Sequence, residues 1–311
     1  MSLTVIQPGL LALLQDAGRF GKHAIGLTSG GPLDPDAFNL CNRLLQNPVG
    51  ATVIEISFGG LELEANCDTS ICITGAVMPL TINGEERERY RVERVRAGDR
   101  ITLGFAEHGC RAYVGVAGGF RIPESFGSTA TVVREGIGGL SGSKLQAGDT
   151  LPCPAKASCK PLYLPPEHHP HYHDTVTVRV IPGYQQASFP RLEQRRFFSH
   201  AYQVSERSDR MGYRMQGPGI RCDIEGILSE GICLGAIQVP ADGQPIVLMN
   251  DRQTIGGYPK IGAALTLDLA RLSQLPPGGT VYFTPITVHA AHNALHLAAS
   301  FAARQPLMEA S

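Results

Sequence analysis

The chain has 311 residues, of which 43% are hydrophobic and 18% are charged, and its formal net charge at pH 7 is −1. This composition is typical of a soluble globular protein and excludes a wholly disordered chain. Lys and Arg are scattered along the sequence, so we expect neither a nucleic-acid-binding surface nor a membrane-binding one. No apolar run reaches the length that a membrane span needs, and we expect a cytoplasmic protein.

The eight cysteines lie mostly inside apolar runs and never form a C-x-x-C pair. They indicate small core residues in a reducing compartment, and we expect no disulfide framework and no metal site built from them. The 36 glycines and 22 prolines are spread over the whole chain. This distribution predicts many tight turns between short strands.

The first half reads as strands closed by turns, with one helix among them. Short apolar runs bounded by Gly, Asn or Asp predict the strands. They are Leu3–Gln7, Val53–Phe58, Ile71–Thr74, Ile101–Phe105 and Ala112–Val116. The helix is predicted from Asp34, a good N-cap, followed by Pro35 at the first helical position, and it ends before Asn47-Pro48.

Proline density rises sharply between Pro152 and Asp174, which predicts an irregular linker. The second half then alternates predicted strands and helices. The strands are Val176–Ile181, Gly235–Val239, Ile246–Met249 and Val281–Phe283, and the helices are Phe189–Phe198 and Val288–Ala303. We predict a mainly β protein with a few helices, divided into residues 1–160, a Pro/His-rich linker at 161–175, and residues 176–311.

Three segments carry polar residues suited to chemistry. The first, residues 15–42, places Asp16 and Arg19 in a glycine-rich loop that leads into a helix. Such a loop can present amide groups and charges to a ligand, while an Asp16–Arg19 pair that only holds a turn is an equally good interpretation.

The second segment, residues 205–215, contains Arg207, Arg210 and Arg214. A guanidinium can bind a carboxylate or phosphate through two hydrogen bonds, although a strand with exposed arginines also explains this segment. In the third segment, residues 235–262, an apolar strand is followed directly by a dense set of polar residues. Because site residues often follow a buried strand directly, we favour a functional site here.

Histidines gather in two places. His168, His169, His171 and His173 lie in the proline-rich stretch, where we expect incidental solvated side chains rather than a metal site. His289, His292 and His296 share one face of the last predicted helix, and we expect a polar face there.

Motifs along almost the whole chain resemble the KipA / biotin-dependent carboxyltransferase family, whose domain also forms the carboxyltransferase part of urea carboxylase. The resemblance rests on eight ordered blocks. They include QDAGRFGKHAIGLTSGGPLDPDAFNLCNRLLQN, IEISFGGLELE, RAYVGVAGGF, GGLSGSKLQAGDTL, SDRMGYRM, GAIQVPADGQPIVLMNDRQTIGGYPKI and QLPPG. The resemblance implies two cyclophilin-like β-barrel subdomains, A and B.

For a chain of this size the resemblance implies one component of a 5-oxoprolinase complex, which uses ATP to convert 5-oxo-L-proline to L-glutamate. The A and B subunits of that complex are then the partners, the B subunit most directly, and ATP with Mg²⁺ is the nucleotide. No A-M-K-M biotin-attachment motif occurs, so no covalently bound biotin is expected. Two alternatives remain: a carboxyltransferase component acting with biotin on a separate protein, and a KipA-type regulatory protein that antagonises a kinase inhibitor.

Activating a lactam by phosphorylating its oxygen requires cations for the phosphoryl group and a group for the substrate carboxylate. We assign Asp16, Asp251 and Lys260 as catalytic candidates, the two aspartates acting as base or Mg²⁺ ligands. The substrate-binding candidates are Arg19, Arg210, Arg252, Thr254 and Tyr258.

Overall fold

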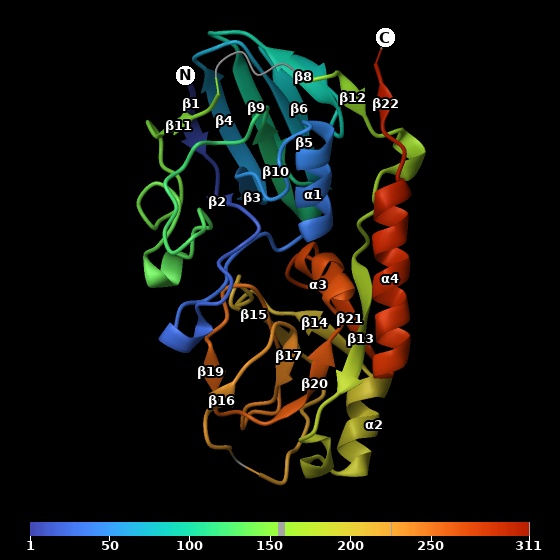
Figure 1. The fold of residues 1–311 in the computed structure, drawn as a ribbon. Coiled ribbons are helices and arrows are strands. Elements are labelled where there is room, and N and C mark those ends of the chain that lie inside the picture. Colours follow the sequence, from blue (N-terminus) through green and yellow to red (C-terminus); the bar gives the residue numbers. More distant parts are fainter. Residues whose placement is uncertain (155–158, 225, 311) are drawn as a thin grey trace. The chain divides into compact units, whose positions relative to one another are not determined.

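The computed structural model describes residues 1–154, 159–224 and 226–310 and divides into two compact units, each with its own core (Figure 1). The first unit comprises Met1–Lys22, Ser29–Tyr172 and the C-terminal segment that begins at Gln305. The second comprises His23–Thr28 and His173–Arg304. The sequence predicted a linker at 161–175 between two domains, and the structure divides the chain within this range, between Tyr172 and His173. The structure also assigns a short N-terminal segment to the second unit and the C-terminal segment to the first.

Two antiparallel sheets form the first unit, with strand orders β11-β1-β4-β9-β6-β7 and β2-β3-β10-β5-β8. The strands are β1 (Ser2–Pro8), β2 (Leu11–Gln15), β3 (Val53–Ser57), β4 (Gly59–Ala65), β5 (Thr69–Val77), β6 (Leu80–Ile82), β7 (Glu85–Arg87), β8 (Val92–Val95), β9 (Arg100–Phe105), β10 (His108–Val116) and β11 (Thr150–Pro152). A separate ladder pairs β12 (Leu162–Tyr163) with β22 (Met308–Glu309).

One apolar core lies between these two sheets. Leu61 and Leu63 of β4 pack in the same cluster as Ile71 and Ile73 of β5. Along β4, buried and half-buried residues alternate, as expected for a strand with one face on the core. Every residue of β3 is buried instead, because a helix covers the other face of its sheet.

That helix is α1 (Pro35–Leu44), and it begins where the sequence predicted. Asp34 caps it, since its Oδ1 accepts a hydrogen bond from the Ala37 amide at 3.0 Å. Phe38 and Cys41 of its inner face pack on Val53 and Tyr113 of the sheet. The predicted strands of the first half are all present as well, within a few residues at each end.

The second unit is a closed barrel with strand order β13-β20-β17-β18-β15-β14-β21. The strands are β13 (Thr175–Pro182), β14 (Ala201–Val204), β15 (Gly212–Gln216), β17 (Ala236–Gln238), β18 (Ile246–Leu248), β20 (Lys260–Ala264) and β21 (Thr280–Pro285), and β16 (Glu230–Gly231) pairs with β19 (Ile255–Gly256) outside the barrel. Only the β13–β21 pair among these described strands is parallel. The expected mainly β fold is confirmed.

Helices accompany the barrel at several points. They are α2 (Arg191–Ser199), α3 (Thr266–Ser273) and α4 (Val288–Arg304), and the short 3₁₀ helices of the chain are η1 (His23–Ile25), η2 (Val133–Glu135), η3 (Pro166–His168) and η4 (Gln186–Ser188). Phe197 of α2 stacks on Phe283 of β21 with ring centroids 4.5 Å apart, which fixes α2 on the barrel. Within the described ranges, no helix is both long and apolar enough to cross a membrane.

Candidate functional site

Asp16 and Arg19 follow β2 in the first unit, and both bind the segment 125–130 rather than each other. Asp16 accepts hydrogen bonds from the Ser128 hydroxyl at 2.6 Å, the Thr129 amide at 2.7 Å and the Gly18 amide at 2.9 Å. Arg19 is fully buried and donates to the carbonyls of Ser125 and Ala130 at 2.8 and 3.1 Å. Both side chains therefore have a structural role, because their polar atoms bind other protein groups of the first unit.

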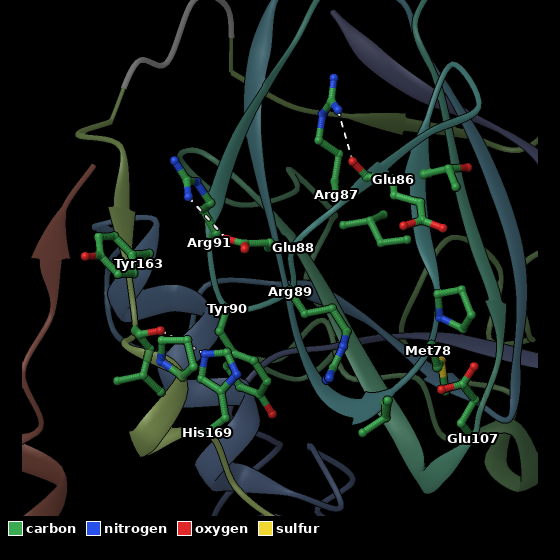
Figure 2. A pocket seen from close by; sticks show the side chains of 16 residues that line it. Met78, Glu86, Arg87, Glu88, Arg89, Tyr90, Arg91, Glu107, Tyr163 and His169 are labelled. Atoms are coloured by element: carbon green, nitrogen blue, oxygen red, sulfur yellow. Dashed lines mark hydrogen bonds and ion pairs between the residues drawn. The ribbon is translucent and has the colours of Figure 1, made fainter. Parts of the chain in front are cut away.

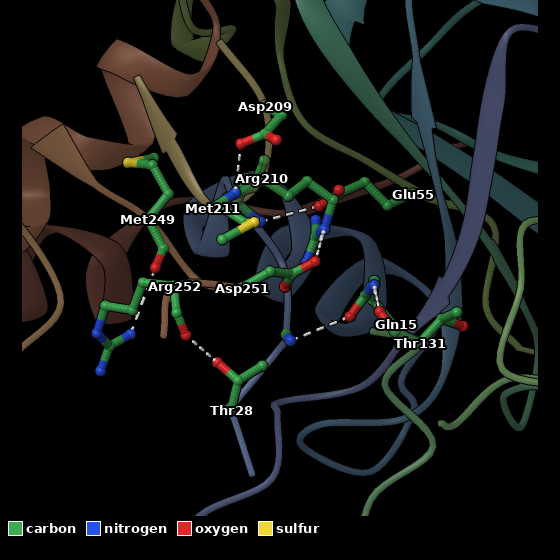
Figure 3. Close-up of polar contacts among 12 residues, drawn as sticks. Gln15, Thr28, Glu55, Thr131, Asp209, Arg210, Met211, Met249, Asp251 and Arg252 are labelled. Atoms are coloured by element: carbon green, nitrogen blue, oxygen red, sulfur yellow. Dashed lines mark hydrogen bonds and ion pairs between the residues drawn. The ribbon is translucent and has the colours of Figure 1, made fainter. Parts of the chain in front are cut away.

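Arg210 and Asp251 form a buried ion pair in the second unit (Figure 3). The Arg210 Nε and Nη2 atoms donate to the two carboxylate oxygens of Asp251 at 2.9 and 3.0 Å, and both side chains are about nine-tenths buried. A two-point guanidinium–carboxylate contact of this kind holds both side chains in one orientation. The charge of Arg210 is therefore compensated inside the protein.

Lys260 lies at the start of β20, where Glu230 neutralises it. Its ammonium group pairs with the Glu230 carboxylate and lies 5.8 Å from the centroid of the Tyr184 ring. The Tyr184 hydroxyl also donates to Glu230, and Gln185 donates to the same carboxylate at 3.0 Å. The hydrogen bond from Lys260 is the main cause that lowers the pKa of Glu230. Glu230, Tyr184 and Gln185 were not expected from the sequence.

Arg252 differs from both of these cations. Its side chain is buried, yet it forms no ion pair with any residue that the structure describes. Its guanidinium instead makes two long hydrogen bonds, from Nε to the Ile232 carbonyl at 3.3 Å and from Nη1 to the Met249 carbonyl at 3.4 Å. Figure 3 shows the second of these bonds. Burial lowers the pKa of Arg252, as expected for a cation removed from water without a carboxylate beside it.

The backbone that carries Arg252 is held from two sides. Its own carbonyl accepts a hydrogen bond from the Thr28 hydroxyl at 2.5 Å, and Thr28 belongs to the N-terminal segment of the same unit. Its amide donates to the Met249 carbonyl at 3.2 Å, directly after β18. The guanidinium is thus placed by fixed backbone rather than by a mobile loop tip.

Arg252 lines a pocket of about 310 Å³ in the second unit. Tyr258, Gln253, Asp209, Arg214 and Gln238 contribute the other polar groups, and apolar residues of β18 complete the wall. This volume is near the lower limit of pockets that bind small molecules, which suits a compact ligand. Of the site residues predicted from the sequence, the pocket brings together Arg252 and Tyr258.

The remaining predicted residues of this unit lie apart from the pocket lining. Asp251 is engaged with Arg210, Lys260 is engaged with Glu230, and Thr254 contributes its backbone carbonyl to a hydrogen bond from Ile232. Gln238, by contrast, lines the pocket and was not predicted, because a single polar residue in the apolar strand β17 carries no motif of its own.

A second pocket, of about 680 Å³, lies in the first unit, and its charged lining comes mainly from the Glu and Arg residues between Glu86 and Arg91 (Figure 2). Its charges are compensated locally. Arg91 pairs with Glu88 at 3.2 Å, and Arg89 donates to the carbonyls of Gly75 and Ala76 at 2.9 and 3.0 Å. This pocket is therefore a weaker candidate for binding an anion than the pocket beside Arg252, because its positive charges are already compensated.

His169 lies at the edge of this second pocket and corrects one sequence-based expectation. Its Nε2 atom is 2.8 Å from the Leu164 carbonyl oxygen, and its ring stacks on Tyr90 with centroids 4.5 Å apart. It is therefore half-buried and packed on Tyr90, whereas His168, His171 and His173 are exposed. No group of three or more His, Cys, Asp or Glu residues is placed to hold a metal ion in the described ranges.

The chain belongs to the family of carboxyltransferase domains with subdomains A and B, whose family model matches residues 25–285. It is 36% identical over 290 residues to the C subunit of 5-oxoprolinase from Escherichia coli K12, and this match covers 93% of each chain. The corresponding protein of Haemophilus influenzae, which has the same name, is 34% identical, with 90% of each chain covered.

The fold also matches the crystal structure of the Kluyveromyces lactis urea amidolyase. The TM-score is 0.92 at 26% identity, and the match covers all of this chain but 20% of the amidolyase. The fold alone is therefore compatible with relatives of different names and different overall architectures.

Proposed function

We propose that this chain is the C subunit of an ATP-dependent 5-oxoprolinase, acting with the A and B subunits to convert 5-oxo-L-proline, ATP and water to L-glutamate, ADP and phosphate. One observation carries the proposal: the match to two bacterial proteins of that name extends over at least 90% of both chains at 34–36% identity. A match of this extent covers both structural units, so it includes the candidate site.

The chemistry of the second unit agrees with this proposal. A lactam carbonyl is a poor electrophile, and transfer of the γ-phosphoryl group of ATP to its oxygen makes the ring carbon open to attack by water. A substrate with one carboxylate needs a cation whose charge is not already compensated. Among Arg210, Arg252 and Lys260, only Arg252 lacks an ion-pair partner in the described part of the chain. We assign ATP and its Mg²⁺ to the complex and to no particular residue here.

Reconstitution tests the proposal directly. The purified chain, mixed with the A and B subunits, is expected to release glutamate from 5-oxoproline only when ATP is present. Omission of this chain should stop the reaction. Arg252→Ala is expected to lower turnover strongly while the protein stays folded, whereas Lys260→Ala, which removes a cation that Glu230 already compensates, is expected to lower it less. Full activity in Arg252→Ala would remove the site assignment, and no glutamate from the complete wild-type mixture would remove the function.

The fold match to urea amidolyase favours a second candidate, a carboxyltransferase component that works with biotin on a separate protein. Avidin separates the two, because it blocks biotin chemistry and leaves a biotin-independent lactam hydrolysis unchanged. A KipA-type regulatory role predicts a third result: tight association with the B subunit without any glutamate release, even when the A subunit is added.

A further inference from the structure

Besides Arg252, which has no ion-pair partner in the described part of the chain, the pocket holds an amide group without a hydrogen-bond partner. Gln238 is 6% exposed at the end of β17, and its Nε2 atom is buried without a hydrogen-bond partner among the residues that the structure describes. A buried amide left in this state costs on the order of 1–3 kcal/mol, and a bound ligand that pairs with it would remove this cost. One small pocket is thus lined by a cation without an ion-pair partner, Arg252, and by an amide without a hydrogen-bond partner, Gln238.

The neighbouring backbone preserves the space around this amide. A Cβ atom on Gly256 would lie 2.6 Å from Gln238 Nε2 and 2.4 Å from Ile232 Cδ1, so the ends of both side chains would have to shift to make room for it. Glycine at this position lets β19 approach the Gln238 carboxamide closely. The carboxamide is therefore enclosed by fixed backbone on this side, while its residue also lines the pocket.

The charges of the lining select the class of ligand. Arg214 and Arg252 are basic and Asp209 is acidic, which leaves a single net positive charge. Asp209 is already used, because its Oδ1 accepts hydrogen bonds from the amides of Met211 and Gly212 at 2.8 and 3.1 Å. A small monoanion matches this balance, whereas a nucleoside triphosphate carries several more negative charges than the lining compensates.

The Gln238 carboxamide further restricts the class of ligand that the pocket can bind. A primary amide offers one acceptor and two donors, and the amide of a small ring is held cis, so that its N–H and C=O lie on the same side. The donor and acceptor of the Gln238 carboxamide are therefore complementary to the C=O and N–H of the ring amide. An open-chain amino acid such as glutamate has no ring amide with its N–H and C=O on the same side.

We propose that this pocket is the lactam-carboxylate site of the chain, in which Arg252 binds the carboxylate of a small cyclic amide and Gln238 binds its ring amide. The identity of the ligand as 5-oxoproline rests on the proposed function. The site itself rests on the two uncompensated side chains. Gln238 is then the residue that distinguishes the closed ring from its opened product.

Titration calorimetry on the full chain tests the proposal with three ligands: 5-oxo-L-proline, 2-pyrrolidinone, which lacks the carboxylate, and cyclopentanecarboxylate, which lacks the amide. Wild-type protein is expected to bind 5-oxoproline most tightly. Arg252→Gln is expected to weaken 5-oxoproline binding roughly 10- to 100-fold and to abolish the preference over 2-pyrrolidinone. Gln238→Met is expected to weaken it about 3- to 10-fold and to abolish the preference over cyclopentanecarboxylate.

Two variants on the same barrel unit serve as matched controls. Arg271→Gln and Gln203→Met change exposed residues outside the pocket and are expected to leave all three affinities unchanged. Both pocket variants should stay folded, since Gln238→Met removes an amide nitrogen without a partner and Arg252→Gln removes a buried charge that has no ion-pair partner among the described residues. A loss of binding with intact folding therefore reports the site.

Two results would overturn the inference. One is wild-type affinity for all three ligands in both pocket variants. The other is no binding of 5-oxoproline to the full chain together with an unchanged KM in the reconstituted complex for both variants. Failure of the proposed function looks different: the wild-type complex would release no glutamate, while the isolated chain would still bind the lactam through Arg252 and Gln238.

Discussion

The cations of the second unit differ in what compensates their charge, and this difference decides their roles. Arg210 has the carboxylate of Asp251, and Lys260 has that of Glu230. Arg252 has two neutral carbonyls at 3.3 and 3.4 Å. A compensated cation is available to a ligand only if its internal partner is given up, so a positive charge has a different functional value at each of the three positions.

Asp251 tests whether the Arg210 pair is structural or catalytic. Asp251→Asn should lower the free energy of unfolding by about 3–5 kcal/mol, because it removes the negative charge that binds the buried Arg210 guanidinium at two points. Urea unfolding of the full chain measures this change. A double variant, Arg210→Met with Asp251→Leu, should recover most of the lost stability, since it removes both charges together.

The same double variant separates the two roles of Asp251 in the reconstituted complex. Turnover close to that of the wild type would assign the pair to the scaffold. If stability returns and glutamate release does not, Asp251 contributes to the chemistry as the sequence suggested.

His169 gives a prediction for the pH dependence of stability. Burial is the main cause that lowers its pKa from 6.5, Arg89 acts in the same direction, and the Leu164 carbonyl opposes both. The unfolded chain therefore binds a proton near pH 6.5, while the folded chain binds it only at lower pH. The contribution of His169 is fully present above pH 6.5 and is lost as the pH falls toward the folded pKa.

Urea unfolding between pH 5 and 8 measures this effect. His169→Phe keeps a ring against Tyr90 and should flatten the fall in stability below pH 6.5. His296→Phe, at an exposed position of α4, should leave the profile of the wild type unchanged. A profile that stays equally steep in His169→Phe would show that another group causes it.

At the scale of elements, Asp16 and Arg19 connect the loop after β2 to the segment 125–130. If this connection is their main role, Asp16→Asn should lower the free energy of unfolding by about 1–3 kcal/mol, because the new NH₂ group faces the Thr129 amide even when the oxygen keeps its bonds to Gly18 and Ser128. Ser128→Ala removes one donor to Asp16 and the acceptor of the Ala130 amide, and it should cost a similar amount, about 1–3 kcal/mol. Both variants should keep turnover in the complex. A stable but inactive Asp16→Asn beside an active Ser128→Ala would instead support Asp16 as a base.

Elements with strong local determinants were predicted from the sequence, and others were not. The helix α1 has Asp34 and Pro35 at its start, and the long strands β1 and β5 have apolar runs bounded by turns. By contrast, α3 begins after Leu265 without a side-chain cap, and β14 and β15 have four and five residues. Such elements are fixed by pairing with distant strands, which a local pattern does not contain.

In the same way, only some residues of the candidate site were predicted from the sequence. Arg252 and Tyr258 were found because they belong to a polar cluster directly after a buried strand. Gln238 stands alone in an apolar strand, and it reaches the pocket only because β17 pairs with β18 in the closed barrel. Glu230 lies 30 residues before Lys260 and meets it through the folded chain. Neither the place of Gln238 in the pocket nor the pairing of Glu230 with Lys260 could be inferred from spacing along the sequence.

For the whole molecule, the two units have separate cores, and this affects how the protein unfolds. The first unit is built around the cluster between its sheets, and the second around the closed barrel. Proteins with more than one core often depart from a single two-state transition. Calorimetry of the full chain is therefore expected to resolve two thermal transitions, one for each unit.

Variants already described assign these transitions. Asp16→Asn should lower the temperature of one, and Asp251→Asn that of the other, because each residue is anchored within its own unit. A ligand stabilises only the part that binds it, by about 2.7 kcal/mol when its concentration is 100 times the Kd. Since all residues of the Arg252–Gln238 pocket belong to the barrel unit, 5-oxoproline should raise only the transition that Asp251→Asn lowers. A shift confined to the other transition would place the lactam site in the first unit and contradict the assignment to Gln238.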